Sequence, residues 1–352
     1  MKHTFLTHAR RSMPSLLLAL LAVVVGSYSH ALDEYKDWDI ACDNTKHCEA
    51  AGTESEEAFD GDTAHAVALW IGRDAGPNTP VLGTLTLSDR SYAAASQASV
   101  VVGGKRFTLN VAPNGDLDPA PLKVLLAAML NENEARISTA GQTWVLSLAG
   151  FKAAALKMDE MQGRLFTPGA LVRKGNKPES TVPPPLPAPV VHAVPFQPNR
   201  KGDDALAGPV LAAVADRDCF DNLPDDQGPQ ISVVRVSSTQ VIVERECSRA
   251  AYQSEPTLWL ANDKPPYSPK EVEFADARPA NTSGAGQYNF ELDAKSGHAD
   301  SMMKGRGLND CNESEEWAWT GRRFVVTQAW TAPQCRGIPG GVSLRVWVSA
   351  EK

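Results

Sequence analysis

The sequence lacks the short motifs that identify many hydrolases, since it contains neither Gly-x-Ser-x-Gly nor His-Glu-x-x-His. Its six cysteines include no pair with the Cys-x-x-Cys spacing of a redox or zinc site, and its seven histidines are scattered along the chain. These absences argue against a motif-bearing enzyme. We therefore expect no catalytic residues, no metal and no cofactor.

Long apolar runs are also missing beyond the N-terminus, so no later segment predicts a membrane span. The N-terminus has the features of an export signal: Lys2, Arg10 and Arg11 precede an apolar run at 16–25, and a Ser-x-Ala sequence ends at Ala31. This run is shorter than the roughly 20 residues that cross a bilayer. We expect a signal peptide that is cleaved after Ala31, with a permanent N-terminal anchor as the alternative.

Removal of residues 1–31 leaves all six cysteines in a protein that we expect to be periplasmic or secreted, where thiols oxidise. Cleavage removes three basic and no acidic side chains, so 34 basic residues fall to 31 against 42 acidic ones, a net charge of −11. Nucleic acid and anionic lipid surfaces repel a protein of this charge. We expect neither as a partner.

Proline is concentrated in residues 174–202, where basic side chains outnumber acidic ones. Because proline lacks an amide donor and fixes φ, this segment predicts an extended linker with few packing sites. The flanking stretches 32–173 and 203–352 each have the length of an ordinary domain. The sequence thus predicts two independent domains joined by a proline-rich basic linker.

The first domain has the pattern of an antiparallel sheet with two helices. Residues 38–42 alternate apolar and polar side chains, and Gly103-Gly104 separates two strand-like stretches as a hairpin turn. Asp118 precedes a helix at 119–130, and a second helix has its apolar face within 148–158.

The second domain opens with an apolar helical run at 210–214 and then turns into strands. Strand-like stretches separated by turn residues lie at 231–236, 240–246, 258–260, 288–292, 324–329 and 344–348. This spacing is typical of an antiparallel β-sandwich or a barrel-like domain. The whole chain is therefore expected to be strand-rich α+β.

Six cysteines allow fifteen disulfide pairings, and the sequence alone does not select one. Proximity along the chain and the domain boundaries favour Cys42–Cys48, Cys219–Cys247 and Cys311–Cys335. Each bond would then lie within one domain, where it restrains the unfolded chain.

Charged, aromatic and glycine residues gather around the last of these cysteine pairs. Arg306, Asp310, Trp317, Trp319 and Arg336 are the candidate ligand-binding residues, because tryptophan rings can stack on a sugar or a peptide. In the alternative, one tryptophan packs in the core while Arg306 and Asp310 fix a turn. Aromatic residues usually bury area before they bind a ligand, so the alternative is favoured.

The same motifs carry a resemblance to a known family. They are Asp37 to Asn44 with Cys48, Cys247 to Tyr252, Lys304 to Cys311, Trp317 to Gly321, and Cys335 to Gly337. Together they resemble a proteobacterial envelope family catalogued as domain of unknown function 1176. This family implies no catalytic residues.

The first domain alone shows a second, shorter resemblance. Its Trp–Cys opening and the helix that starts in Leu148 to Ala154 look like the invasion-associated locus B family of secreted proteins. This likeness implies a shared fold and, as an alternative function, a secreted invasion-associated factor.

Taken together, these features predict a non-enzymatic binding or interaction module of the bacterial envelope. Its partner would be an envelope protein, a peptide or a glycan. The rival prediction is an envelope hydrolase whose paired carboxylates no linear motif reveals.

Overall fold

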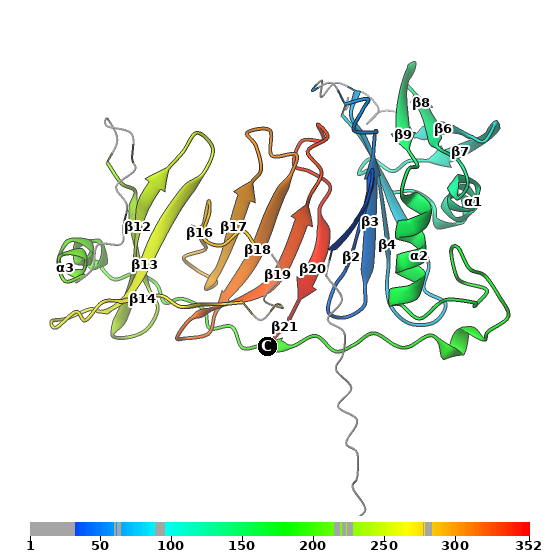
Figure 1. Cartoon of the computed structure of the whole chain (residues 1–352). Coiled ribbons are helices and arrows are strands. Elements are labelled where there is room, and N and C mark those ends of the chain that lie inside the picture. The colour runs from blue at the N-terminus through cyan, green and yellow to red at the C-terminus, as the bar shows by residue number, and fades with distance from the viewer. Residues whose placement is uncertain are drawn as a thin grey trace, which may run out of the picture.

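The computed structural model describes residues 32–352 apart from 60, 62–64, 89–95, 215–218, 220–222, 224–227, 277 and 279–283. Its strands form open, mainly antiparallel sheets with few helices (Figure 1), which confirms the strand-rich α+β class and fits the sandwich alternative. The export signal predicted at 1–31 lies outside the described residues. Within them, no helix has the length and apolar character that a membrane crossing needs.

The described chain begins with a five-stranded antiparallel sheet in which each strand pairs with the next. Its strands are β1 (Leu32–Tyr35), β2 (Trp38–Cys42), β3 (Cys48–Thr53), β4 (Val67–Arg73) and β5 (Leu82–Leu87). The sequence did not predict β3, because small residues dominate it and Thr53 is its only β-branched residue.

A four-stranded sheet and two helices complete this N-terminal part, which we define as residues 32–173. The sheet has the order β7-β6-β8-β9 and consists of β6 (Gln97–Val102), β7 (Lys105–Asn110), β8 (Glu134–Thr139) and β9 (Gln142–Ser147). Gly103 and Gly104 have φ values of 55° and 73°, which confirms the predicted hairpin turn. Helices α1 (Pro119–Met129) and α2 (Phe151–Met161) confirm the two predicted helices.

Two further sheets form the C-terminal part, residues 203–352. One has the order β11-β12-β13-β14, and the other has the order β15-β19-β18-β17-β16 with β20 also paired to β19. The first sheet consists of β11 (Ile231–Arg235), β12 (Gln240–Arg249), β13 (Ser254–Asn262) and β14 (Lys270–Glu271). The second consists of β15 (Phe274–Ala275), β16 (Glu291–Leu292), β17 (His298–Lys304), β18 (Asn312–Trp319), β19 (Phe324–Ala332) and β20 (Leu344–Val348).

Three details of this part differ from the sequence prediction. The helix α3 occupies Ala207–Ala212, so the run predicted at 210–214 starts earlier. The strand predicted at 288–292 is confined to its last two residues, because Asn289 adopts a positive φ of 46°. Strands β17 and β18 were missed, since polar and acidic residues interrupt their apolar alternation.

The two parts share a hydrophobic core, which the sequence did not predict. Both faces of β2 and β3 are buried. One face packs with α2, whereas Ala41 and Ala51 on the other face join the cluster that contains Leu344 and Trp347 of the C-terminal part. The alternation at 38–42 therefore does not mark a solvent-facing side: Asp39 is only 3% exposed, because β20 and residues 333–342 before it cover that face of the sheet.

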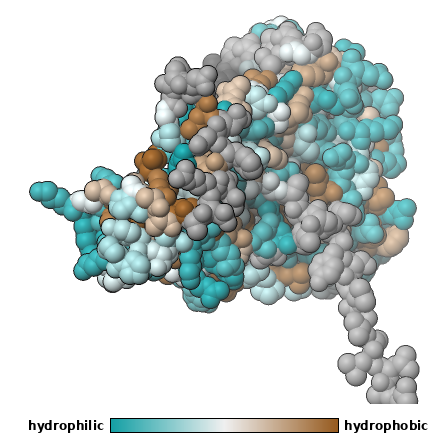
Figure 2. All heavy atoms as spheres, turned by 60° about the vertical axis from the view of Figure 1, so that its left-hand side comes forward, coloured by the Kyte–Doolittle hydropathy of each residue, from teal (hydrophilic) through white to brown (hydrophobic). Residues whose placement is uncertain are grey.

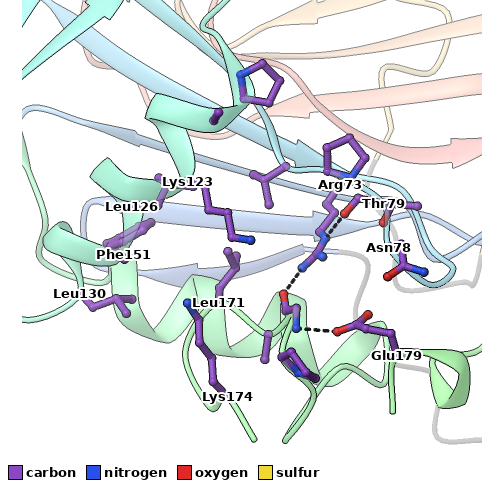
Figure 3. Close-up of a pocket in the computed structure, with 18 residues that line it drawn as sticks. Arg73, Asn78, Thr79, Lys123, Leu126, Leu130, Phe151, Leu171, Lys174 and Glu179 are labelled. Carbon is purple, nitrogen blue, oxygen red and sulfur yellow. Dashed lines mark hydrogen bonds between the residues drawn. The ribbon is translucent and has the colours of Figure 1, made fainter. Parts of the chain in front are cut away.

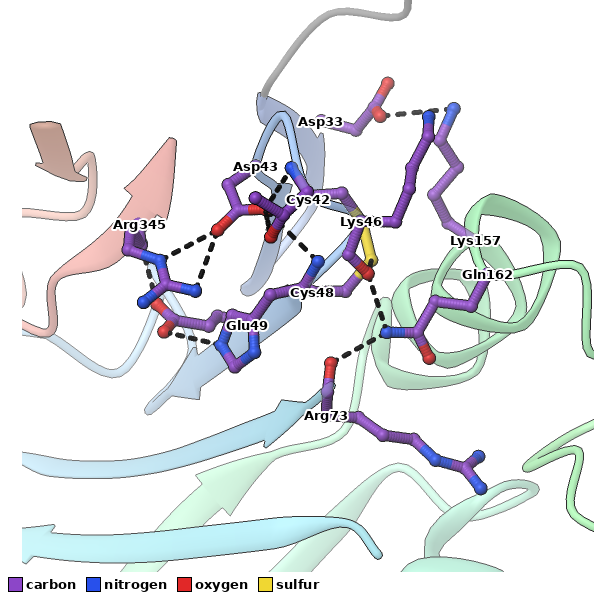
Figure 4. Close-up of a disulfide and its surroundings, with 12 residues drawn as sticks. Asp33, Cys42, Asp43, Lys46, Cys48, Glu49, Arg73, Lys157, Gln162 and Arg345 are labelled. Atoms are coloured by element: carbon purple, nitrogen blue, oxygen red, sulfur yellow. Dashed lines mark hydrogen bonds and ion pairs between the residues drawn. A yellow bond between two sulfur atoms is a disulfide. The ribbon is translucent and has the colours of Figure 1, made fainter. Parts of the chain in front are cut away.

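Polar contacts surround this shared core (Figure 4). Beside the Cys42–Cys48 disulfide, Arg345 donates from Nε to Oδ2 of Asp43 at 2.8 Å and from its backbone amide to Glu49 at 2.6 Å. Asn44 exchanges two hydrogen bonds of 2.9 Å with the backbone of Val348. These contacts join the end of the β2–β3 hairpin to β20.

Residues 174–202, which we call the strap, run along both parts (Figure 1). The backbone amide of Leu186 donates to Thr45 at 3.1 Å, and that of Val194 donates to Trp319 at 2.7 Å. Within the strap, β10 (Val190–Val191) pairs in parallel with β21 (Ala350–Glu351). The expectation of few packing sites is wrong, because amides between the prolines remain free to pair. The predicted domain boundaries stay a prediction.

Candidate functional site

A pocket of about 470 Å³ lies in the N-terminal part between α1 and the segment 168–174 (Figure 3). Buried apolar side chains line its interior, namely Val81, Leu126, Phe151 and Ala170. The volume falls within the range of small-molecule sites. Within the described residues, this pocket is therefore a candidate ligand-binding site.

Helix α1 forms one wall of the pocket because of its residue spacing. Ala120, Lys123, Ala127 and Leu130 recur at intervals of three and four, so they lie on one side of the helix and line the pocket. The neighbouring side, with Leu122 and other buried residues, packs into the core. The helix is thus anchored by one side and presents the other to a ligand.

The segment 168–174 forms the opposite wall and is fixed from behind. The carboxylate of Asp159 on α2 accepts hydrogen bonds from the amides of Leu171 and Val172 at 2.8 and 2.9 Å. Arg73 donates from Nη1 to the carbonyl of Gly169 at 2.8 Å, and Glu179 accepts the Gly169 amide. These bonds hold the wall in place before any ligand arrives.

A second buried arginine fixes the third wall, the loop 74–81. Arg164 is fully buried and donates from Nη2 to the carbonyls of Asp74 and Gly76 at 2.9 and 2.6 Å and to the Thr79 hydroxyl at 2.5 Å. Burial, together with the nearby Arg164, lowers the pKa of Arg73 to about 10, and burial lowers the pKa of Arg164. Burial also raises the pKa of Asp159.

Two lysines give the pocket its polarity. In Figure 3 the side chains of Lys123 and Lys174 extend into the space between α1 and the segment 168–174. Both residues are exposed, and neither forms an ion pair or a side-chain hydrogen bond with another described residue. Glu179, the one carboxylate in the lining, is already hydrogen-bonded to Gly169. The pocket therefore combines an apolar interior with unneutralised positive charge.

Sequence reasoning missed most of this site. Asp159 could have been found from the sequence: a carboxylate on the apolar side of a predicted helix is expected to have a buried partner. No sequence pattern indicated Arg73, Arg164 or Glu179, since their partners are distant in the sequence. Lys174 was assigned to the linker on composition alone.

The structure places the predicted ligand-binding residues elsewhere and separates them. Trp317 and Trp319 are 3% and 0% exposed and belong to the shared core. Trp317 Nε1 donates to Ser301 Oγ at 3.0 Å, and the Trp319 ring lies 5.3 Å from that of Phe324. Both rings face inward, because residues two apart on a strand share a face. Neither ring can stack on a ligand.

The charged residues of that set stabilise a loop. Arg306 donates from Nε to Asp310 at 2.6 Å, and Asp310 also accepts the Gly337 amide at 2.6 Å. Arg336 lies 3.4 Å from Glu56 of the N-terminal part. Arg306 and Asp310 thus fix a turn, as the alternative interpretation predicted, and Arg336 contributes to the contact between the two parts.

Two other patterns near this loop carry no site. Ser301 to Lys304 has the Ser-x-x-Lys spacing, but Ser301 is 2% exposed and accepts the hydrogen bond of Trp317. Asp310 lies close to Cys311 and Cys335, but the two sulfurs are bonded to each other. All three favoured disulfides are present, and the described cysteines include no free thiol.

Fold and site together define a strand-rich, disulfide-bonded protein of two parts with a preformed apolar pocket. The chain belongs to the family "Protein of unknown function (DUF1176)", which matches residues 32–350. The family resemblance seen in the sequence is therefore confirmed.

One curated relative and one solved structure show similarity to the chain. The "Uncharacterized protein YpfG" of Escherichia coli (strain K12) is 24% identical over 332 residues, which cover 86% of this chain and 88% of that protein. The crystal structure of invasion associated protein b from Bartonella henselae is 16% identical and covers 38% of this chain and 98% of its own, with a TM-score of 0.27.

Proposed function

We propose that this protein is an exported, non-enzymatic binding protein of the bacterial envelope, located in the periplasm. Its ligand has an apolar body and one anionic group. The observation that carries the proposal is the preformed apolar pocket with Lys123 and Lys174 unpaired within the described residues. Three disulfides support an oxidising compartment.

The lining of the pocket favours binding over catalysis. It includes no cysteine, serine or histidine, and Glu179 is occupied by the Gly169 amide. The two lysines are its other proton-transfer candidates, and both are exposed, whereas a catalytic lysine is usually activated by desolvation. The envelope hydrolase and the secreted invasion-associated factor stay as alternatives, and no feature of the pocket favours either.

The pocket sets the expected affinity for such a ligand. Burial of an alkyl chain of about ten carbons contributes up to ~8 kcal/mol, at ~0.8 kcal/mol per methylene group. The loss of translational and rotational freedom offsets at least ~4 kcal/mol of this. The remaining ~4 kcal/mol corresponds to a dissociation constant of about 1 mM, and the two lysine contacts, at up to ~1 kcal/mol each, lower it to several tens of micromolar at best.

The test is calorimetric titration of the mature protein with decanoate and with decyltrimethylammonium. The two probes share an alkyl chain and differ in the sign of the head group. Decanoate should bind and the cation should not. Equal binding of both probes, or of neither, would contradict the proposal.

A double variant and a control test whether the two lysines bind the anionic group. Lys123→Gln combined with Lys174→Gln should weaken decanoate binding about three- to tenfold, the effect of two exposed charge contacts. The matched control is Lys177→Gln, which removes a charge from an exposed strap residue outside the pocket. The control should bind as the wild type does.

A further inference from the structure

A second cleft, independent of the pocket above, lies in the C-terminal part and has a volume of about 380 Å³. Strand β12 contributes Glu244 and Glu246, which share a face because they are two residues apart. Ser232 of β11 pairs with Glu244, and Pro256 of β13 pairs with Glu246, so three adjacent strands form one side of the cleft.

A turn from the other sheet closes the base of the cleft. Asn289 donates from its backbone amide to the Ser254 carbonyl at 2.8 Å and accepts the Ser254 amide on Oδ1 at 3.1 Å. Its Nδ2 donates to the carbonyl of Met302 on β17 at 2.8 Å. Phe290, which is 6% exposed, adds an apolar side chain to the lining. The cleft is therefore preformed between the two sheets.

The two glutamates differ in their partners. Glu246 accepts Arg249 Nε at 2.6 Å and the Gln230 amide at 3.1 Å, so its charge is neutralised. Glu244 accepts only the Ser232 hydroxyl, at 2.6 Å, and forms no ion pair with any described residue. Burial without a cation raises the pKa of Glu244. One carboxylate in the cleft thus lacks a countercharge.

Apolar and aromatic surface lies next to this carboxylate. Tyr252, in the lining, is 40% exposed, and Phe290 of the lining adds a second aromatic side chain. Tyr252 lies beside Gly307, where a Cβ atom would meet its Cδ1 at 3.6 Å. Figure 2 brings this end of the molecule forward, and its coloured residues expose hydrophobic surface in separate areas among hydrophilic ones. The tyrosine ring offers a face to an alkyl chain or a cation.

We propose that this cleft binds a primary ammonium group carried on an aliphatic chain, with the ammonium on Glu244 and the chain against Tyr252 and Phe290. A free diamine and the lysine side chain of a peptide both have this chemistry. The inference does not depend on the anionic ligand of the first pocket. It assigns to the C-terminal part a cationic ligand, opposite in charge to the anionic ligand proposed for the first pocket.

The test is calorimetric titration of the mature protein with 1,5-diaminopentane, with N-acetyl-lysine amide and with 1-pentanol as the neutral analogue. At least one of the two amines should bind, and 1-pentanol should not. Preference for the diamine identifies a free amine, whereas preference for the lysine amide identifies a peptide side chain. Failure of both amines to bind would overturn the proposal.

Variants distinguish a built site from general attraction to an acidic protein. Glu244→Gln should weaken amine binding at least tenfold, because a charge-assisted hydrogen bond is lost. Glu255→Gln is the matched control: it removes the same charge from an exposed residue of β13 that lies outside the cleft lining. Equal weakening by both variants, or none by Glu244→Gln, would reject the site. Unchanged thermal unfolding of Glu244→Gln shows that the variant is folded.

Discussion

Asp39 places a carboxyl group inside the contact between the two parts of the protein. It lies with Thr53, Gln334 and Arg336 around a small cavity in this contact. Burial, followed by the charge of Glu34, raises the pKa of Asp39 from 3.8 to about 7. Ionisation of this residue therefore costs free energy in the folded protein.

The sign of the resulting pH dependence follows from linkage. Between about pH 4 and pH 7 the unfolded chain ionises Asp39 while the folded protein keeps it neutral, so stability falls as pH rises through this window. Asp39→Asn should remove this fall and be more stable than the wild type at pH 8, by up to ~4 kcal/mol. Thermal unfolding from pH 4 to pH 8 measures the difference.

The control for this prediction is Asp204→Asn, at an exposed residue. It should follow the wild-type curve. An Asp39→Asn variant that is less stable than the wild type at pH 8 would show that the ionised carboxylate stabilises the contact.

At the scale of elements, the sequence predicted one wall of the pocket and missed the others. The helix at 119–130 and the spacing that sets Lys123 on one side of it were readable from local pattern. The wall at 168–174 was not, because its position depends on Asp159 and Arg73, whose partners are set by tertiary contacts. β18 was missed because its buried face is not apolar along its whole length.

The disulfide Cys311–Cys335 lies in the C-terminal part, but the loop it restrains contacts the N-terminal part. Cys335 belongs to the loop 333–343, in which Gln334 accepts a hydrogen bond from Thr53 at 2.7 Å. Ile338 of the same loop packs against Ala66 and Ala68. The bond therefore restrains a loop that contacts the N-terminal part.

Replacing both Cys311 and Cys335 with serine should destabilise the protein by about 3.5 kcal/mol, the loop-entropy value for this closure. The double variant leaves no unpaired thiol from this bond. Hydrogen exchange should increase in the loop 333–343 and also in β4 of the N-terminal part. Increased exchange confined to the C-terminal part would contradict the coupling.

At the scale of the whole molecule, composition predicted two parts and a linker but not their union. The proline-rich strap and the strands on each side were readable, because they depend on local residue types. The shared core was not, since the polar side of β2 looks like a surface until β20 covers it. Alternation identifies a strand and leaves open what lies on its polar face.

Cutting the strap tests this union directly. With a protease site inserted after the exposed residue Leu186, the cleaved halves should elute together in gel filtration and unfold in one transition. Separate elution at micromolar concentration would restore the prediction of independent domains.

Arg345→Ala provides a graded version of the same test. It removes the 2.8 Å contact with Asp43, so the cleaved halves of the variant should separate more readily than those of the cleaved wild type, whereas the uncut variant should elute as one species. An unchanged elution profile would show that the union does not depend on this ion pair.

The pairing of β10 with β21 has a consequence for the order in which the protein matures. The amides of Ala350 and Lys352 donate to Pro189 and Val191 of the strap at 2.8 and 3.0 Å. Chains grow from the N-terminus, so β20 and β21 are synthesised after every described strand of the N-terminal sheet. Until β20 is made, the face of the N-terminal sheet that β20 covers stays exposed. A prematurely terminated chain would keep that face open, and its exposed strand surface would mark it for chaperones and proteases.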